Sequence, residues 1–177
     1  MNIIIKKRFL LYKGYKFKCS IGKSGIKKNK KEGDYATPQG IFSLGKFYYR
    51  PDRIKKITTN LSFKKIKKNM GWCNDSRIIK YNKEVNRNKI KNSEKLFRKD
   101  HKYDAFIVIN YNSNPVIKNK GSAIFLHLTK NYKPTAGCIA IKKKDFFKLI
   151  KIINNKTRII IFLFSFAKNF SSNSNIS

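Results

Sequence analysis

Short apolar runs, rich in β-branched and aromatic residues and bounded by turn residues, recur along the chain. Runs of this kind predict β-strands, because such side chains suit a pleated, half-buried surface. They occupy residues 17–21, 41–44, 105–111, 123–127, 137–141 and 157–164. The pattern therefore predicts a protein that is mainly β.

Two segments predict helices. Residues 143–153 carry apolar side chains at the i, i+3, i+4 and i+7 spacing of one helix face. These side chains are Phe146, Leu149, Ile150 and Ile153. Residues 93–99 begin with a Ser-Glu pair, which is a signal for a helix N-terminus. Residues 50–91 show few regular patterns and predict a loop-rich insertion.

The length of 177 residues corresponds to one domain, and a content of 41% hydrophobic residues supports a packed core. We assign residues 1–167 to this domain and the Asn- and Ser-rich residues 168–177 to a polar tail. The apolar stretch in residues 1–7 is too short for the core of a secretory signal. The run at 159–164 is far shorter than the roughly 20 residues needed to span a bilayer. We therefore predict no membrane-spanning segment.

The chain carries 42 Lys and Arg residues against 9 Asp and Glu residues, which gives a formal net charge of +33. Such a charge suits contact with nucleic acid, an anionic membrane or an acidic polymer. The lysine runs at 27–31, 64–68 and 142–144 are scattered, however, and few aromatic residues are placed to stack bases. We interpret them as solvated surface combined with a compositional bias, and we expect no nucleic-acid partner. Peripheral contact with an anionic wall or membrane stays open.

A histidine and a cysteine stand close together in the last third of the chain. His127 ends one apolar run, and Cys138 opens the next one 11 positions later, with Pro134 and Gly137 as turn residues between them. Two strands joined by such a loop bring an imidazole beside a thiol, which is how proteins generate a cysteine nucleophile. The alternative is a small buried cysteine that fills the core.

The two other cysteines carry no such context. Cys19 and Cys73 lie among apolar or aromatic residues without CxxC spacing, so we predict that they fill the core. A redox pair of either one with Cys138 is an alternative that no motif supports. Two histidines and three dispersed cysteines form no metal-ligand pattern, so we expect neither a metal nor another cofactor.

Several short sequence motifs follow one another along the chain, and their order carries more information than any one of them alone. They are KEGDYATPQGIF at 31–42, GWCND at 71–75, YNKEV at 81–85, SEKL at 93–96, Asp100, YD at 103–104, GSAIFLH at 121–127 and TAGC at 135–138. The last block is similar to the Ser/Thr-x-Gly-Cys motif of the L,D-transpeptidase (YkuD-type) family, which a histidine precedes. Together the blocks resemble a small single-domain subgroup of that family over about residues 23–161.

The resemblance implies a compact mixed-sheet fold, sandwich- or barrel-like, with one or two short helices. It implies that Cys138 is the nucleophile and His127 its general base. We expect Gly137 to have two compatible roles: it allows a turn with φ > 0, and it clears space beside the thiol so that backbone N–H groups can face an oxyanion. An imidazolium at His127 would lower the thiol pKa from its free value of about 8.5. We predict that the substrate contacts Thr135, Ala136, Ser122 and Trp72. For Thr135, a structural role in the turn is the alternative.

By the same resemblance, the substrate is a peptidoglycan tetrapeptide stem. The thiolate would attack the carbonyl that joins the L-centre of a diamino acid to terminal D-Ala, giving a thioester. The amine of a second stem would then form a 3→3 cross-link, whereas attack by water would make the enzyme an L,D-carboxypeptidase. A non-enzymatic basic protein that binds wall polymer or nucleic acid is a further alternative.

The chain departs from the wider family around the cysteine. Many members carry His before Gly-Cys and Arg or Asn after it, whereas Ala136, Ile139 and Ala140 occupy those positions here. How the stem carboxylate is held stays open, and Arg50 and Arg98 are candidates by residue type. A wall substrate favours a periplasmic site of action. The cytoplasm is the alternative, since no signal sequence is visible near the N-terminus.

Overall fold

A nine-stranded sheet organises the chain in the computed structural model, which describes residues 1–55 and 57–163. Its strands are β1 (Ile3–Lys6), β2 (Phe9–Tyr12), β3 (Tyr15–Ser20), β6 (Gly40–Tyr49), β7 (Phe63–Lys65), β11 (Ala105–Ile109), β12 (Phe125–Thr129), β13 (Ile139–Lys142) and β14 (Arg158–Ile161). They lie in the order β11-β12-β13-β3-β2-β1-β14-β6-β7. The pairs β12–β13, β1–β14 and β6–β7 are parallel, so the sheet is mixed.

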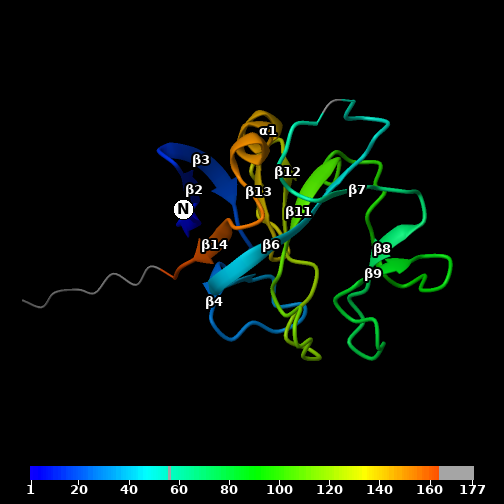
Figure 1. Ribbon diagram of the computed structural model, residues 1–177. Coiled ribbons are helices and arrows are strands. Elements are labelled where there is room, and N and C mark those ends of the chain that lie inside the picture. Colours follow the sequence, from blue (N-terminus) through cyan, green and yellow to red (C-terminus); the bar gives the residue numbers. More distant parts are fainter. Residues whose placement is uncertain (56, 164–177) are drawn as a thin grey trace, which may run out of the picture.

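The long strand β6 closes this sheet on itself. Its first residues pair with β14, as in Phe42 with Ile159, and its later residues pair with β11, as in Tyr48 with Phe106. Because β6 joins both ends of the strand order, the sheet has a barrel-like arrangement, and β6 crosses the middle of the view in Figure 1. The prediction of a mainly β, mixed-sheet fold is confirmed.

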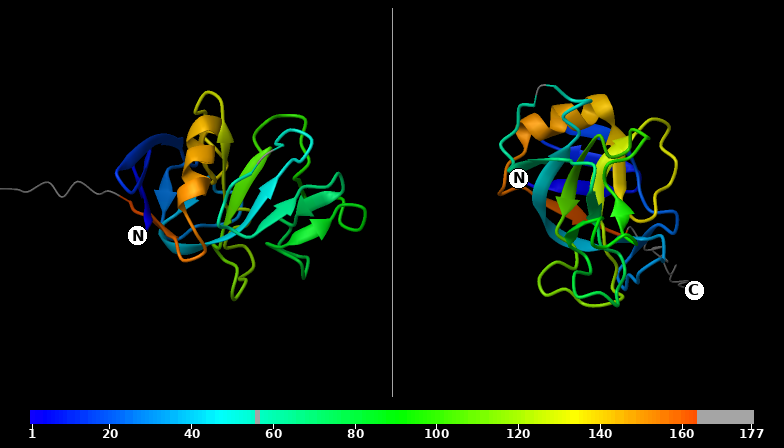
Figure 2. Two further views of the ribbon diagram at one scale, coloured as in Figure 1. Left: turned by 45° about the horizontal axis from the view of Figure 1, so that its top comes forward. Right: turned by 90° about the vertical axis from the view of Figure 1, so that its right-hand side faces the viewer.

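Two smaller sheets complete the described structure. One contains β8 (Met70–Trp72), β9 (Glu84–Asn86) and β10 (Glu94–Lys95), and the other contains β4 (Ile26–Lys27) and β5 (Thr37–Pro38). The β8–β9 hairpin lies at the opposite end of the molecule from β1 and β2 (Figures 1 and 2). Hence the segments between β7 and β11 form an extension beyond the barrel.

Side-chain alternation along the central strands divides the interior into two apolar clusters. In β11, Ile107 belongs to the cluster beneath the helix, whereas Phe106 belongs to a second, aromatic cluster on the side of the β8–β9 hairpin. In β12, Leu126 belongs to the first cluster and Phe125 to the second. Since successive side chains of a strand point to opposite faces, His127 lies on the face of Phe125.

The helix α1 (Lys143–Ile152) follows β13 directly and packs against β12 and β13. Phe146, Leu149 and Ile150 are fully buried, as the periodicity of residues 143–153 predicts. The helix therefore covers the cluster beneath it and holds the two strands that flank the Cys138 loop (Figure 2).

The helix predicted over residues 93–99 is wrong. Glu94 and Lys95 form the edge strand β10, and Glu94 pairs with Trp72 of β8. The Ser93 hydroxyl donates to the Ile90 carbonyl instead of capping a helix. Seven residues are too few to stabilise an isolated helix, so pairing with a neighbouring strand decides the conformation.

The sequence patterns also missed the strands at the N-terminus. Residues 1–7 contribute β1, where Ile3 and Ile5 are fully buried, and β2 follows at once. Residues 50–91 are loop-rich as predicted, but they contain β7, β8 and β9. The predicted tail at 168–177 lies outside the described residues, as does residue 164 of the last predicted strand. In the part of the chain that the structure describes, no helix is long and apolar enough to cross a membrane.

Candidate active site

One cleft of about 910 Å³ gathers most of the residues that the sequence singles out. Cys138 and His127 line it, and so do Thr135, Ala136 and Ser122. The cause is the parallel pairing of β12 with β13, in which His127 lies opposite Ala140 and Cys138 directly precedes β13. The two strands thus place imidazole and thiol at the same end of the sheet.

Two backbone groups hold the Cys138 thiol, which is 7% exposed. The sulfur donates to the Ala123 carbonyl at 3.2 Å and accepts from the Phe125 N–H at 3.3 Å. Ala123 adopts a left-handed backbone conformation with φ of 52°, which is uncommon for a residue with a Cβ. That conformation belongs to the segment that leads into β12, so the thiol is tied to the strand that carries His127.

A single backbone contact orients the imidazole of His127. Its Nδ1 lies 2.9 Å from the Leu128 carbonyl oxygen. A carbonyl only accepts hydrogen bonds, so Nδ1 carries the proton and Nε2 of the neutral ring keeps its lone pair. The ring also contacts Tyr103 edge-on, with centroids 5.4 Å apart and planes at 73°. Nε2 is therefore the nitrogen that can act as a base.

Burial keeps both groups neutral. It lowers the pKa of His127 to about 4, and it raises the pKa of the Cys138 thiol to about 12, with the nearby charge of Glu94 as the next cause. The sequence-based expectation that an imidazolium lowers the thiol pKa is wrong for this resting state. Near neutral pH the cleft therefore holds a thiol and a neutral imidazole.

The turn before Cys138 requires glycine at position 137. Gly137 has φ of +141°, and a Cβ there would lie 2.8 Å from the Ala36 carbonyl oxygen. Its N–H donates to the Thr135 hydroxyl at 3.1 Å, and that hydroxyl donates to the Cys138 carbonyl at 2.5 Å. Thr135 therefore shapes the turn, and the Gly137 N–H is already occupied by a hydrogen bond.

Thr37 fixes this turn from a distant part of the chain. Its hydroxyl is fully buried, accepts from the Gly22 N–H at 2.8 Å and donates to the Gly137 carbonyl at 2.8 Å. Thr135 exchanges backbone hydrogen bonds with Ile21 and Lys23 beside it. The Thr-Pro-x-Gly block of the sequence thus supports the loop that carries the thiol.

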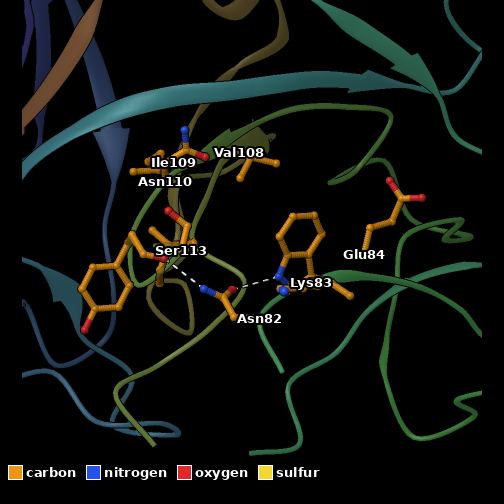
Figure 3. Close-up of a pocket in the computed structure, with 10 residues that line it drawn as sticks. Asn82, Lys83, Glu84, Val108, Ile109, Asn110 and Ser113 are labelled. Atoms are coloured by element: carbon orange, nitrogen blue, oxygen red, sulfur yellow. Dashed lines mark hydrogen bonds between the residues drawn. The ribbon is translucent and has the colours of Figure 1, made fainter. Parts of the chain in front are cut away.

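Asn82 fixes the other side of the thiol. Its Oδ1 accepts from the Ala123 N–H at 3.0 Å and from the Trp72 indole at 2.9 Å, and its Nδ2 donates to the carbonyls of Tyr111 and Asn112. Figure 3 shows Asn82 on the wall of a second cavity of about 220 Å³, with hydrogen bonds of its side chain drawn as dashed lines. Trp72 lines this second cavity and not the cleft that holds Cys138.

Several residues of the cleft have chemistry that the sequence patterns did not assign. Tyr103, Glu94 and Glu32 line it, and the Tyr103 hydroxyl donates to Glu94 Oε1 at 2.5 Å. Arg98 lines it too, whereas Arg50 does not: Arg50 is buried and pairs with Asp52. Glu32, Glu94 and Tyr103 lie inside the sequence blocks, and Arg98 lies beside one. A block of sequence does not show, however, which of its side chains meet in the fold.

The lining of the cleft is basic toward the solvent. Exposed lysines contribute to it, namely Lys102, Lys130, Lys133 and Lys143. Lysines of the three sequence runs are mostly exposed, as predicted, but Lys30 is 3% exposed and pairs with Asp34 at 2.7 Å. Among the described residues, the cysteines are free thiols, and no group of three or more His, Cys, Asp or Glu side chains could hold a metal ion.

The chain is similar to known proteins. Residues 4–161 match the family model of YkuD, the L,D-transpeptidase catalytic domain. No curated protein matches the chain. A solved structure, that of Bdellovibrio bacteriovorus Bd1075, is similar over 91% of this chain and 47% of its own, with 17% identity and a TM-score of 0.46. The chain thus spans about half the length of that structure.

Replacement of Thr37 by Val tests the contact between the two distant segments. Thr37→Val keeps the side-chain shape but leaves the Gly22 N–H and the Gly137 carbonyl without their partner, so we expect a loss of about 1–3 kcal/mol in unfolding free energy. Denaturant unfolding measures it, with the exposed Thr58→Val as the matched control. A loss below about 0.5 kcal/mol, the usual range of surface changes, would argue against this role.

Alkylation of Cys138 tests the protonation states. With a neutral thiol and a neutral imidazole, the rate with iodoacetamide should rise steadily from about pH 6 to about pH 9, because the thiolate is the reacting form. His127→Ala should change this rate little at neutral pH. Mass spectrometry of the peptide that contains Cys138 separates it from Cys19 and Cys73. A fast plateau near neutral pH that disappears in His127→Ala would instead indicate a thiolate–imidazolium pair.

Proposed function

The chain belongs to the L,D-transpeptidase catalytic-domain (YkuD) family, and on that premise we propose that it is a cysteine-dependent L,D-transpeptidase of peptidoglycan stem peptides. The family acts on peptidoglycan, so this substrate class is its general property. One observation carries the proposal for this chain: Cys138 and His127 line a single cleft, with the thiol held by two backbone groups and Nε2 of the imidazole left as a base.

In the proposed first step, the Cys138 sulfur attacks the carbonyl between the L-centre of the diamino acid and terminal D-Ala. The thiol proton passes to Nε2 of His127 as the C–S bond forms. The tetrahedral intermediate collapses with the proton returned to the nitrogen of the leaving D-Ala, and a thioester on Cys138 remains. Because thiol and imidazole are both neutral at rest, proton transfer accompanies attack and does not precede it.

In the second step, the side-chain amine of another stem attacks the thioester. His127 accepts a proton from that amine and returns it to the sulfur, which restores the thiol and leaves a 3→3 amide bond. Water in place of the amine releases a tripeptide stem, which is L,D-carboxypeptidase activity. A cleft of about 910 Å³ is near the upper end of small-molecule sites and supports a large substrate.

Substrate contacts are proposed from the lining of the cleft. Ala136 is exposed beside the thiol, and Ser122 places a hydroxyl without a hydrogen-bond partner among the described residues in the same lining. Thr135 acts mainly through the turn. Arg98 lies at the cleft and pairs with Asp100, so it is the better of the two arginine candidates for a stem carboxylate. Trp72 supports the site through Asn82 and does not meet the substrate.

We propose that the protein acts in the periplasm, where the stems are assembled into the wall. The net charge of +33 would favour adhesion to anionic wall or membrane, and salt would weaken it because surface charges are screened beyond about 8–10 Å near physiological ionic strength. A purely structural basic protein is the rival function. A structural role would not require the Cys138 thiol and the His127 imidazole to line the same cleft.

Carbapenem labelling tests the nucleophile. We expect a single covalent adduct in intact-mass spectra of the unmodified chain and none in Cys138→Ala, because a β-lactam acylates the same sulfur that a stem would. Cys73→Ala removes a buried thiol that lies outside the cleft and is the matched control. Cys138→Ser should also lose more than about nine-tenths of turnover, since a lost nucleophile normally costs several kcal/mol. An adduct that persists in Cys138→Ala would refute the assignment.

Product analysis separates the two activities. A disaccharide tetrapeptide is incubated with the enzyme, with and without an excess of a second, tripeptide stem as amine donor. For a transpeptidase, cross-linked dimer should form at the expense of free tripeptide product, because the amine competes with water for the thioester. Release of D-Ala at the same rate in both reactions, without dimer, would identify the carboxypeptidase.

A further inference from the structure

Tyr103 packs against His127 and lies in the same buried cluster and the same cleft as Cys138. It directly precedes Asp104 and β11, is 6% exposed, and its ring lies against the imidazole of His127. The rings of Phe106 and Phe125 hold it from the other sides, with centroids 5.3 and 5.7 Å away. The ring is therefore fixed, and only the direction of the hydroxyl proton can change.

The hydroxyl of Tyr103 binds a carboxylate in the cleft that Cys138 lines. It donates to Glu94 Oε1 at 2.5 Å, and hydrogen bonding from it lowers the pKa of Cys138, whereas the Glu94 charge raises that pKa. In a chain of charge +33, Glu94 makes no ion pair within the described residues. Tyr103 is its hydrogen-bond partner in place of a cation.

We propose that Tyr103 is a positioning residue of this active site: its ring fixes the imidazole of His127, and its hydroxyl, held by Glu94, is the donor for the Cys138 thiolate. The proposal rests on the proposed function only in requiring that Cys138 is the reacting residue and that negative charge develops on its sulfur as the proton leaves. In the resting state the thiol donates to the Ala123 carbonyl. Once it loses its proton it can only accept, so a donor beside the Phe125 N–H stabilises it.

Glu94 and the thiolate compete for the single proton of the Tyr103 hydroxyl. Removing the Glu94 charge should therefore favour the thiolate, while removing the Tyr103 hydroxyl should disfavour it. The other charged groups that act on Glu94 are Arg98, Lys102 and Glu32, and Lys30 also acts on Cys138. Neither Glu94→Gln nor Tyr103→Phe changes any of these groups. The two substitutions should shift the alkylation rate of Cys138 in opposite directions, whereas a general loss of packing would not.

The chain offers a matched control on the second cavity. There the Tyr48 hydroxyl donates to Glu84 Oε2 at 2.8 Å, and the Tyr48 ring stacks on Phe106 from β11. Figure 3 shows Glu84 on the wall of that cavity, to which Cys138 does not contribute. The two tyrosine–glutamate pairs thus share an aromatic neighbour but differ in their access to the thiol.

The experiment measures iodoacetamide alkylation of Cys138, by peptide mass spectrometry across pH, in Glu94→Gln, Tyr103→Phe, Glu84→Gln and Tyr48→Phe. Gln keeps an oxygen for the Tyr103 hydroxyl, and Phe keeps the ring. A pKa change of half a unit alters the thiolate fraction about threefold, so we expect at least about a threefold faster reaction in Glu94→Gln. We expect a similarly slower one in Tyr103→Phe and unchanged rates in the two control variants.

Opposite shifts confined to the Tyr103 pair support the proposal. Shifts of the same sign, no shifts, or equal shifts in the Tyr48 pair would overturn it. Thermal melts confirm that each variant is folded at the temperature of the assay. The assay uses no stem peptide, so its outcome is independent of carbapenem labelling. Failure of the acylation test would refute the proposed function while the thiol measurement still decided the role of Tyr103.

Discussion

Two hydrogen bonds between the Cys138 sulfur and the backbone before β12 are the contact on which the site depends. The thiol donates to Ala123 and accepts from Phe125, so the residue that precedes β13 is locked to the strand of His127. Parallel pairing alone would align the strands but would leave the rotation of the thiol free. Ala123 presents its carbonyl from a left-handed conformation, which costs of order 1–3 kcal/mol for a residue with a Cβ. The hydrogen bond from the Ala123 N–H to Asn82 stabilises this conformation.

Burial of His127 and Cys138 shifts the pKa values of both side chains and so makes the stability of the fold depend on pH. The unfolded chain protonates a histidine near pH 6.5, but His127 in the fold does so only at about 4. Between pH 6.5 and about 4 the unfolded state therefore binds more protons than the folded state. The contribution of His127 to stability is complete above pH 6.5 and is lost as the pH falls toward about 4. The same low-dielectric surroundings favour the protonated form of the Cys138 thiol.

Segments far apart in the sequence hold the site in place. Thr37 reaches Gly137 across 100 positions, and Asn82 reaches Ala123 across 41. Each is a single polar side chain with several well-placed backbone partners, an arrangement that stabilises because the buried groups are satisfied. It also explains why short blocks scattered over the chain accompany the histidine and the cysteine: their polar residues converge on two loops, one on either side of the thiol.

Local patterns determined the class of the fold, the helix that begins at Lys143 and the placement of His127 and Cys138 in one cleft. These features depend on short-range periodicity, turn residues and a motif, all of which a linear sequence displays. Only the tertiary structure decided that β6 closes the barrel, that Glu94 lies in an edge strand and not in a helix, and that the two residues are neutral at rest. Strand pairing and burial arise from partners distant in sequence, so the energy that selects them is absent from any local window.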